Sequence, residues 1–152
     1  MPSAFPFHGS VCFEVALAIS EHVRPMGLGR VLINDSGVVT ERDPDTVRGP
    51  NVAFYSKARL PAGELPRGRY LETVPELVVE VRSPSDRWQQ ILQKVSEYLS
   101  AGVSVVVVID PSSNSANVYR DEGSPESFGP EATLTIPDLL PGFSVPVARF
   151  FQ

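Results

Sequence analysis

Residues 76–102, ELVVEVRSPSDRWQQILQKVSEYLSAG, decide the fold because they predict a buried strand, a turn and an amphipathic helix in succession. Residues 77–81 are apolar except for Glu80, and a proline lies on either side of this run. Such a strand is typical of a sheet that is covered on both faces, where an isolated carboxylate needs a cation, a hydrogen-bond donor or a proton. Glu80 is therefore a candidate for a functional site or for a structural ion pair.

The residues after Glu80 predict a strand-helix-strand unit. We expect Ser85 or Asp86 to cap the helix and Gly102 to end it. The apolar residues at helical spacing predict one buried face, formed by Trp88, Ile91, Leu92, Val95 and Leu99. The β-branched run at 103–109 then predicts a central strand that is parallel to the first and joined to it by a right-handed crossover.

This unit predicts a cluster of charged side chains on one face of the sheet. Alternation along the strand places Glu80 and Arg82 on the same face. Lys94 and Tyr98 are one turn apart on one flank of the following helix. A helix that packs over this face would bring Lys94 toward Glu80.

The rest of the chain predicts an α/β domain that spans residues 1–152, with a mixed central β-sheet flanked by helices. We expect a helix over 9–22, and a hairpin whose strands, 30–34 and 37–41, surround an Asn-Asp-Ser-Gly turn. Residues 56–73 lack a clear period and predict a surface loop. Shorter strands are expected at 52–55, 116–120 and 132–136, and a last hydrophobic segment at 145–151.

Composition limits the function classes. The chain has 152 residues, 42% of them hydrophobic, and a net charge of −5, which argues against broad wrapping of nucleic acid but not against a local basic groove. Its one cysteine, Cys12, excludes an internal disulfide framework and is expected to be a buried helix residue. The sequence has no run long enough for a membrane span and no signal-peptide pattern, so we expect a cytoplasmic protein without membrane partners.

Several motifs together resemble one nuclease family. They are PELVVEVRSPSD, followed by Lys94, Tyr98 and AGV, then IDP and LPGF, with HG at position 8 and TVRGPNVAFYS at 46–56 upstream. In combination they resemble the Uma-two family of restriction-type endonucleases, a branch of the PD-(D/E)XK nucleases, from His8 to the C-terminus. The resemblance implies a restriction-endonuclease-like core. Family members commonly carry a further segment, with an N-terminal strand pair, ahead of the position of His8; either the domain is naturally shorter here or the sequence as given does not begin at its full start.

The resemblance also implies a chemistry, which is metal-assisted hydrolysis of phosphodiester bonds with Mg²⁺ or Mn²⁺. It implies Glu80 and Asn51 at the two metal-ligand positions and Lys94 as the catalytic lysine. Contacts to phosphate or substrate are expected from Arg82, Ser83 and Tyr98. The implied partner is nucleic acid, with DNA as the expected polymer, and the implied assembly is a homodimer.

Asn51 departs from the family pattern, which has an aspartate in its PD dipeptide. A neutral amide is a poorer ligand for a hard divalent cation, so Asn51 predicts that hydrolysis is absent or strongly reduced. Asp43 or Asp45 is close enough in sequence to supply the missing charge. His8 is expected to be structural or exposed rather than catalytic.

Three function classes stay open at this point. The first is a magnesium-dependent endonuclease with a weakened site. The second is a catalytically inactive nuclease-fold domain that binds nucleic acid or a protein partner. The third is a structural or oligomerising module, in which the clustering of Glu80, Arg82 and Lys94 has no chemical role.

Overall fold

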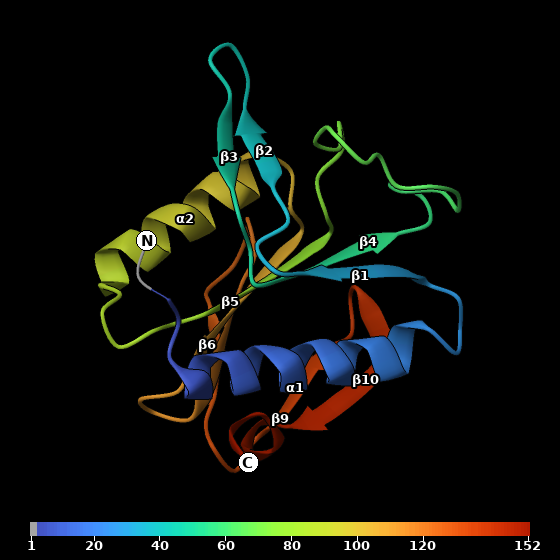
Figure 1. The fold of residues 1–152 in the computed structure, drawn as a ribbon. Helices are drawn as coiled ribbons and strands as arrows, with labels where there is room; N and C mark the ends of the chain where they lie inside the picture. Colours follow the sequence, from blue (N-terminus) through green and yellow to red (C-terminus); the bar gives the residue numbers. More distant parts are fainter. Residues whose placement is uncertain (1–2) are drawn as a thin grey trace.

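The fold is built on a mixed six-stranded sheet, as seen in a computed structural model that describes residues 3–152 (Figure 1). The strands lie in the order β1-β4-β5-β6-β7-β8, and of the neighbouring pairs β5 and β6 run parallel while the others run antiparallel. These strands span Gly29–Ile33 (β1), Val52–Ser56 (β4), Leu77–Val81 (β5), Val105–Asp110 (β6), Ser115–Tyr119 (β7) and Glu126–Phe128 (β8). The predicted mixed sheet and its parallel crossover unit are therefore confirmed.

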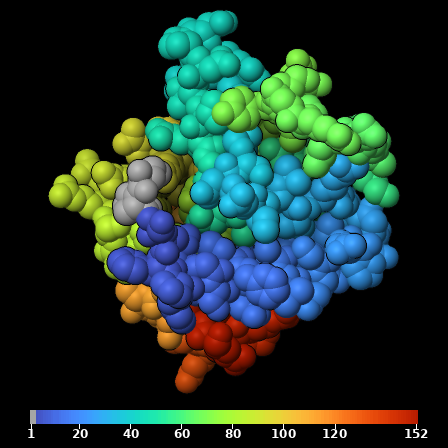
Figure 2. Space-filling model, viewed as in Figure 1, coloured from blue at the N-terminus to red at the C-terminus, as the bar shows by residue number. Residues whose placement is uncertain are grey.

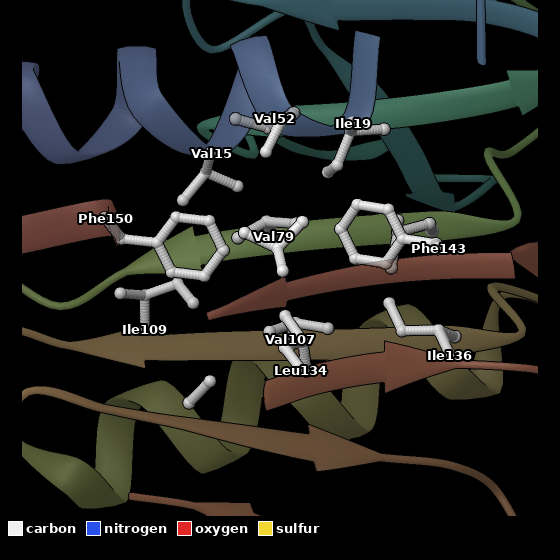
Figure 3. Close-up of a cluster of buried hydrophobic side chains, with 14 of the residues drawn as sticks. Val15, Ile19, Val52, Val79, Val107, Ile109, Leu134, Ile136, Phe143 and Phe150 are labelled. Carbon is white, nitrogen blue, oxygen red and sulfur yellow. The ribbon is translucent and has the colours of Figure 1, made fainter. Parts of the chain in front are cut away.

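Helix α1 (Pro6–Val23) covers one face of the sheet. The hairpin β9 (Thr133–Ile136) and β10 (Leu140–Pro146) packs there too, together with the short 3-10 helix η1 (Val147–Phe151). Val79 and Val107 of the sheet point into this layer, where they pack with Phe143 of β10 and Phe150 of η1 (Figure 3). The larger hydrophobic core lies between α1, the sheet and the C-terminal segment.

Helix α2 (Trp88–Ser100) covers the opposite face. Val78, Val106 and Val108, which alternate with the residues that face α1, pack against Ile91, Val95 and Tyr98. Every side chain of β5 and β6 is buried, because helices cover both faces of the sheet at these strands. Glu80 shares the parity of Val78 and so lies on the α2 face.

The predicted hairpin of 30–34 and 37–41 is wrong. Strand β1 pairs with β4, whereas β2 (Val38–Glu41) pairs with β3 (Thr46–Arg48) in a separate hairpin that stands out from the body (Figure 2). Asn34 and Asp35 have φ values of 65° and 57°, and these left-handed residues lie where the chain leaves the sheet. The polar stretch between β2 and β4 contains β3, which the sequence pattern does not indicate.

Some boundaries also differ from expectation. Helix α2 follows Arg87, with no side-chain cap, because the Asp86 carboxylate accepts the Ser83 backbone N–H at 2.9 Å instead. Leu92, expected on the buried face of α2, is exposed, and strand β8 lies between the expected strands at 116–120 and 132–136. Residues 57–73 contain no helix or strand, as predicted. None of the helices within residues 3–152 combines the length and hydrophobicity that a membrane span needs.

Arg48 holds the β2–β3 hairpin against α2. Its Nη2 donates to Glu97 Oε1 at 2.9 Å, and its Nε donates to Oε2 at 2.5 Å. This two-point pairing holds the pKa of Glu97 below its ordinary value, because the hydrogen bonds and positive charge of Arg48 favour the carboxylate.

Candidate functional site

Glu80 is the buried acid of β5, and only 5% of its surface is exposed. Within residues 3–152 its carboxylate accepts one hydrogen bond, from Tyr98 Oη to Oε1 at 2.8 Å. Loss of hydration raises the pKa of Glu80 above its ordinary value, while the positive charge of Lys94 and the Tyr98 hydrogen bond oppose this rise. The structure therefore brings Glu80, Tyr98 and Lys94 together on the α2 face.

Tyr98→Phe tests whether the hydroxyl stabilises this buried carboxylate. The phenol is fully buried, so its removal leaves Glu80 without a donor, and we expect the free energy of unfolding to fall by about 1–3 kcal/mol. Tyr70→Phe, at an exposed ring, is the control and should change it by less than about 0.5 kcal/mol. Urea denaturation measures both, and equal stability of Tyr98→Phe and wild type would contradict the assigned hydrogen bond.

Arg82 contacts other parts of the protein. Its guanidinium donates to Asp110 Oδ1 at 3.3 Å and to the Asp86 carbonyl at 3.1 Å, and it lies 5.2 Å from the centre of the Trp88 ring. These contacts join the end of β5 to the end of β6 and to the start of α2. An ion pair between Arg82 and Glu80 is therefore not formed, and a phosphate contact by Arg82 stays a prediction.

The predicted contact residue Ser83 and the predicted catalytic lysine, Lys94, lie at the borders of the site. Ser83 follows β5 and lines a cavity with Arg82 and Asp110. Lys94 is half-buried on α2 and lines a groove with Arg48, and its positive charge acts on Glu80 although their atoms are too far apart for an ion pair. Their roles in substrate binding and catalysis stay predictions.

Asn51 lies beside the residue that follows Glu80. Its Oδ1 accepts the Val81 backbone N–H at 2.7 Å, and its Nδ2 donates to Asp35 Oδ1 at 3.3 Å. Strands β4 and β5 are neighbours, so residues 51 and 80 meet at one edge of the pair although 29 positions separate them in sequence. The predicted pair of positions is thus adjacent in space, with the Asn51 amide already bonded on both sides.

Asp35 is the acid near Asn51, and Asp43 and Asp45 are not. The latter two lie in the exposed turn that joins β2 to β3, where Asp45 pairs with Arg42 at 3.6 Å. The sequence alone does not single out Asp35, because the Asn-Asp-Ser-Gly stretch also suits a hairpin turn. Its abundance of polar residues directly after a strand was the available signal.

His8 of α1 contacts the end of β5, next to Glu80. Its Nε2 lies 2.8 Å from the Val81 carbonyl, which can only accept, so Nε2 donates. Nδ1 is then the acceptor for the Cys12 thiol at 3.6 Å, and burial raises the pKa of Cys12 to about 11. His8 is half-buried within α1, and its contact with Val81 fixes the helix against the strand that carries Glu80.

A cavity of ≈ 280 Å³ opens beside these groups. Its lining includes the polar side chains of His8, Asp35 and Asn51 and the apolar or weakly polar side chains of Cys12, Phe13 and Ile33. Asn51 and Asp35 are therefore reachable from solvent, whereas Glu80 is nearly enclosed.

A family model described as "Putative restriction endonuclease", Uma2, matches residues 1–148. The chain belongs to the Uma2 family. The solved structure of "a putative nuclease belonging to DUF820 from Anabaena variabilis ATCC 29413" has a TM-score of 0.84 to this chain at 20% sequence identity. The match covers 99% of this chain and 83% of that one and shows that the nuclease fold is shared. No curated protein matches the chain.

Restriction-endonuclease-like families such as Uma2 generally use divalent metals. The donors near Asn51 fit such an ion, because they are the hard oxygens of Glu80, Asp35 and the Asn51 amide, and Mg²⁺ binds one or two carboxylates while it keeps several waters. Within residues 3–152, no three side chains of the His, Cys, Asp or Glu types lie close enough together to hold a metal by themselves. Water or phosphate oxygens would have to complete the coordination.

Proposed function

We propose that this Uma2 protein is a metal-dependent endonuclease of low activity that hydrolyses phosphodiester bonds in nucleic acid, with DNA as its substrate. The observation that supports it best is the meeting of positions 51 and 80 on neighbouring strands, with Asn51 lining an open cavity. We assign Glu80 as the main metal ligand and the Asn51 carbonyl as a weak one. Mg²⁺ or Mn²⁺, when bound, would neutralise the phosphate and activate a water.

The residues of this chain would divide the remaining work. Lys94 offers a positive charge near Glu80, suited to hold a phosphate oxygen or to orient a water. Tyr98 of α2 holds the Glu80 carboxylate in place through its 2.8 Å hydrogen bond. Arg82 and Ser83, at the end of β5, border a second cavity that would bind the adjacent phosphates of the nucleic-acid backbone. Two copies in a homodimer would present two such sites to a duplex.

A second candidate function is supported by Asn51 itself. A site with a neutral amide in this position carries one negative charge fewer, so a domain that binds nucleic acid without cutting it is the alternative. Binding in the presence of EDTA, without cleavage in Mg²⁺ or Mn²⁺ by either wild type or a repaired variant, would favour this alternative.

Asn51→Asp is the repair that separates the two. The new carboxylate can still accept the Val81 N–H and adds a negative charge, so we expect cleavage of plasmid and linear DNA in Mg²⁺ or Mn²⁺ to rise at least about tenfold, which corresponds to about 1.4 kcal/mol. Asn117→Asp, on β7, adds the same charge elsewhere and should leave cleavage unchanged. Equal, robust cleavage by wild type and Asn51→Asp would show that Asn51 does not weaken the site.

A further inference from the structure

The turn after β1 holds a carboxylate against Asn51. Asp35 accepts the Asn51 Nδ2–H at 3.3 Å, and both Asn34 and Asp35 have left-handed backbone angles, which are uncommon for residues other than glycine. Gly49 makes room for this turn, because a Cβ at position 49 would lie 2.8 Å from Asp35 Cβ and 2.9 Å from the Asp35 carbonyl oxygen. The local backbone is thus arranged around Asp35.

The site contains two carboxyl groups, and the positive charge of Lys94 acts on Glu80 without forming an ion pair. Within residues 3–152, neither Asp35 nor Glu80 forms an ion pair. Asn51 precedes Val52, which pairs with Val79, so Asn51 lies beside Glu80, and Asp35 in turn is hydrogen-bonded to Asn51. Two carboxylates that share a site repel each other, so a cation between them would stabilise the charged form of both.

We propose that Asp35 supplies the second carboxylate of the metal site, in place of the aspartate that position 51 lacks. This inference rests on the proposed metal-dependent function and names the residue that completes it. Besides serving as the weak ligand, Asn51 positions Asp35, because its Nδ2 donates to Asp35 Oδ1 while its Oδ1 accepts the Val81 backbone N–H. Two carboxylates are a suitable number of charged ligands for hard cations such as Mg²⁺ and Mn²⁺.

Mn²⁺ binding to the full chain tests this without reference to activity. Isothermal titration of Mn²⁺ into wild type should show binding that Asp35→Asn weakens at least about tenfold, since one of two charged ligands is lost. In the double variant Asp35→Asn/Asn51→Asp, the new carboxylate should restore the affinity to within about threefold of wild type. Asp43→Asn removes the same charge at the tip of the β2–β3 hairpin and should leave the affinity unchanged.

The outcomes distinguish the inference from the function on which it rests. Wild-type affinity in Asp35→Asn, together with loss of binding in Glu80→Gln, would overturn the role of Asp35 and leave a metal-dependent site. Binding by Asn51→Asp but not by wild type would do the same. Absence of Mn²⁺ binding in both wild type and Asn51→Asp would overturn the proposed function and the inference together. Thermal unfolding of each variant in EDTA shows whether a lost affinity reflects a lost fold.

Discussion

Glu80→Gln is expected to remove metal-dependent cleavage and, at the same time, to stabilise the metal-free protein. Cleavage should fall by more than about a hundredfold, equivalent to about 2.7 kcal/mol, because the main charged ligand is gone. In EDTA at neutral pH the free energy of unfolding should rise by about 1–2 kcal/mol, because burial of the ionised carboxylate is unfavourable and a glutamine carbonyl can still accept the Tyr98 hydroxyl. Nuclease assays and urea denaturation measure the two effects.

The pH dependence of this stability difference provides its control. The pKa of Glu80 is raised in the folded protein from an ordinary value of 4.5, so the folded state holds the proton more tightly than the unfolded state. Below pH 4.5 the carboxyl group is neutral in both states and this contribution to the difference disappears. As the pH rises through the folded-state pKa, wild type loses stability relative to Glu80→Gln. A stability difference independent of pH would contradict the burial of a charge at this position.

Phe150→Ala is expected to have the largest effect on stability alone. Phe150 is 1% exposed and packs beside Val15 of α1 and Ile109 of β6 (Figure 3). Truncation of such a buried ring leaves a cavity, so the free energy of unfolding should fall by about 3–5 kcal/mol. Because η1 and β10 pack against α1, the substitution should also weaken the packing of α1, the helix that carries His8.

Phe13→Ala is the matched control, since this ring on α1 is 61% exposed. It should change the free energy of unfolding by less than about 0.5 kcal/mol in the same urea titration. Similar losses for the two phenylalanines would show that the C-terminal 3-10 helix does not close the core as the structure indicates.

Local patterns were sufficient to predict the centre of the fold. The apolar runs at 77–81 and 103–109 have one stable arrangement, in which helices cover both faces, and the parallel pair β5–β6 confirms it. The alternation that placed Glu80 on the face of α2 depends only on the strand period. The resemblance to Uma2 was carried by the same segment and is confirmed by the family match.

The errors arose where pairing depends on partners distant in sequence. A turn motif such as Asn34-Asp35-Ser36-Gly37 suits a hairpin locally, but β1 obtains a longer partner in β4 and the chain turns out of the sheet. That choice cannot be read from the turn itself. It also decides which acid reaches Asn51, so nearness in sequence, which pointed to Asp43 and Asp45, does not identify Asp35.

Gly49 gives this chain a steric means of adjusting its electrostatics. Gly49 has no side chain, and the space that a Cβ would occupy is filled by the Asp35 backbone and Cβ. A methyl group at position 49 would displace the Asp35 turn while every oxygen and nitrogen of the site stayed chemically unchanged. The position of the Asp35 carboxylate therefore depends on the size of the residue at position 49, in the connection between β3 and β4. Substitutions there can move this carboxylate without altering any donor atom.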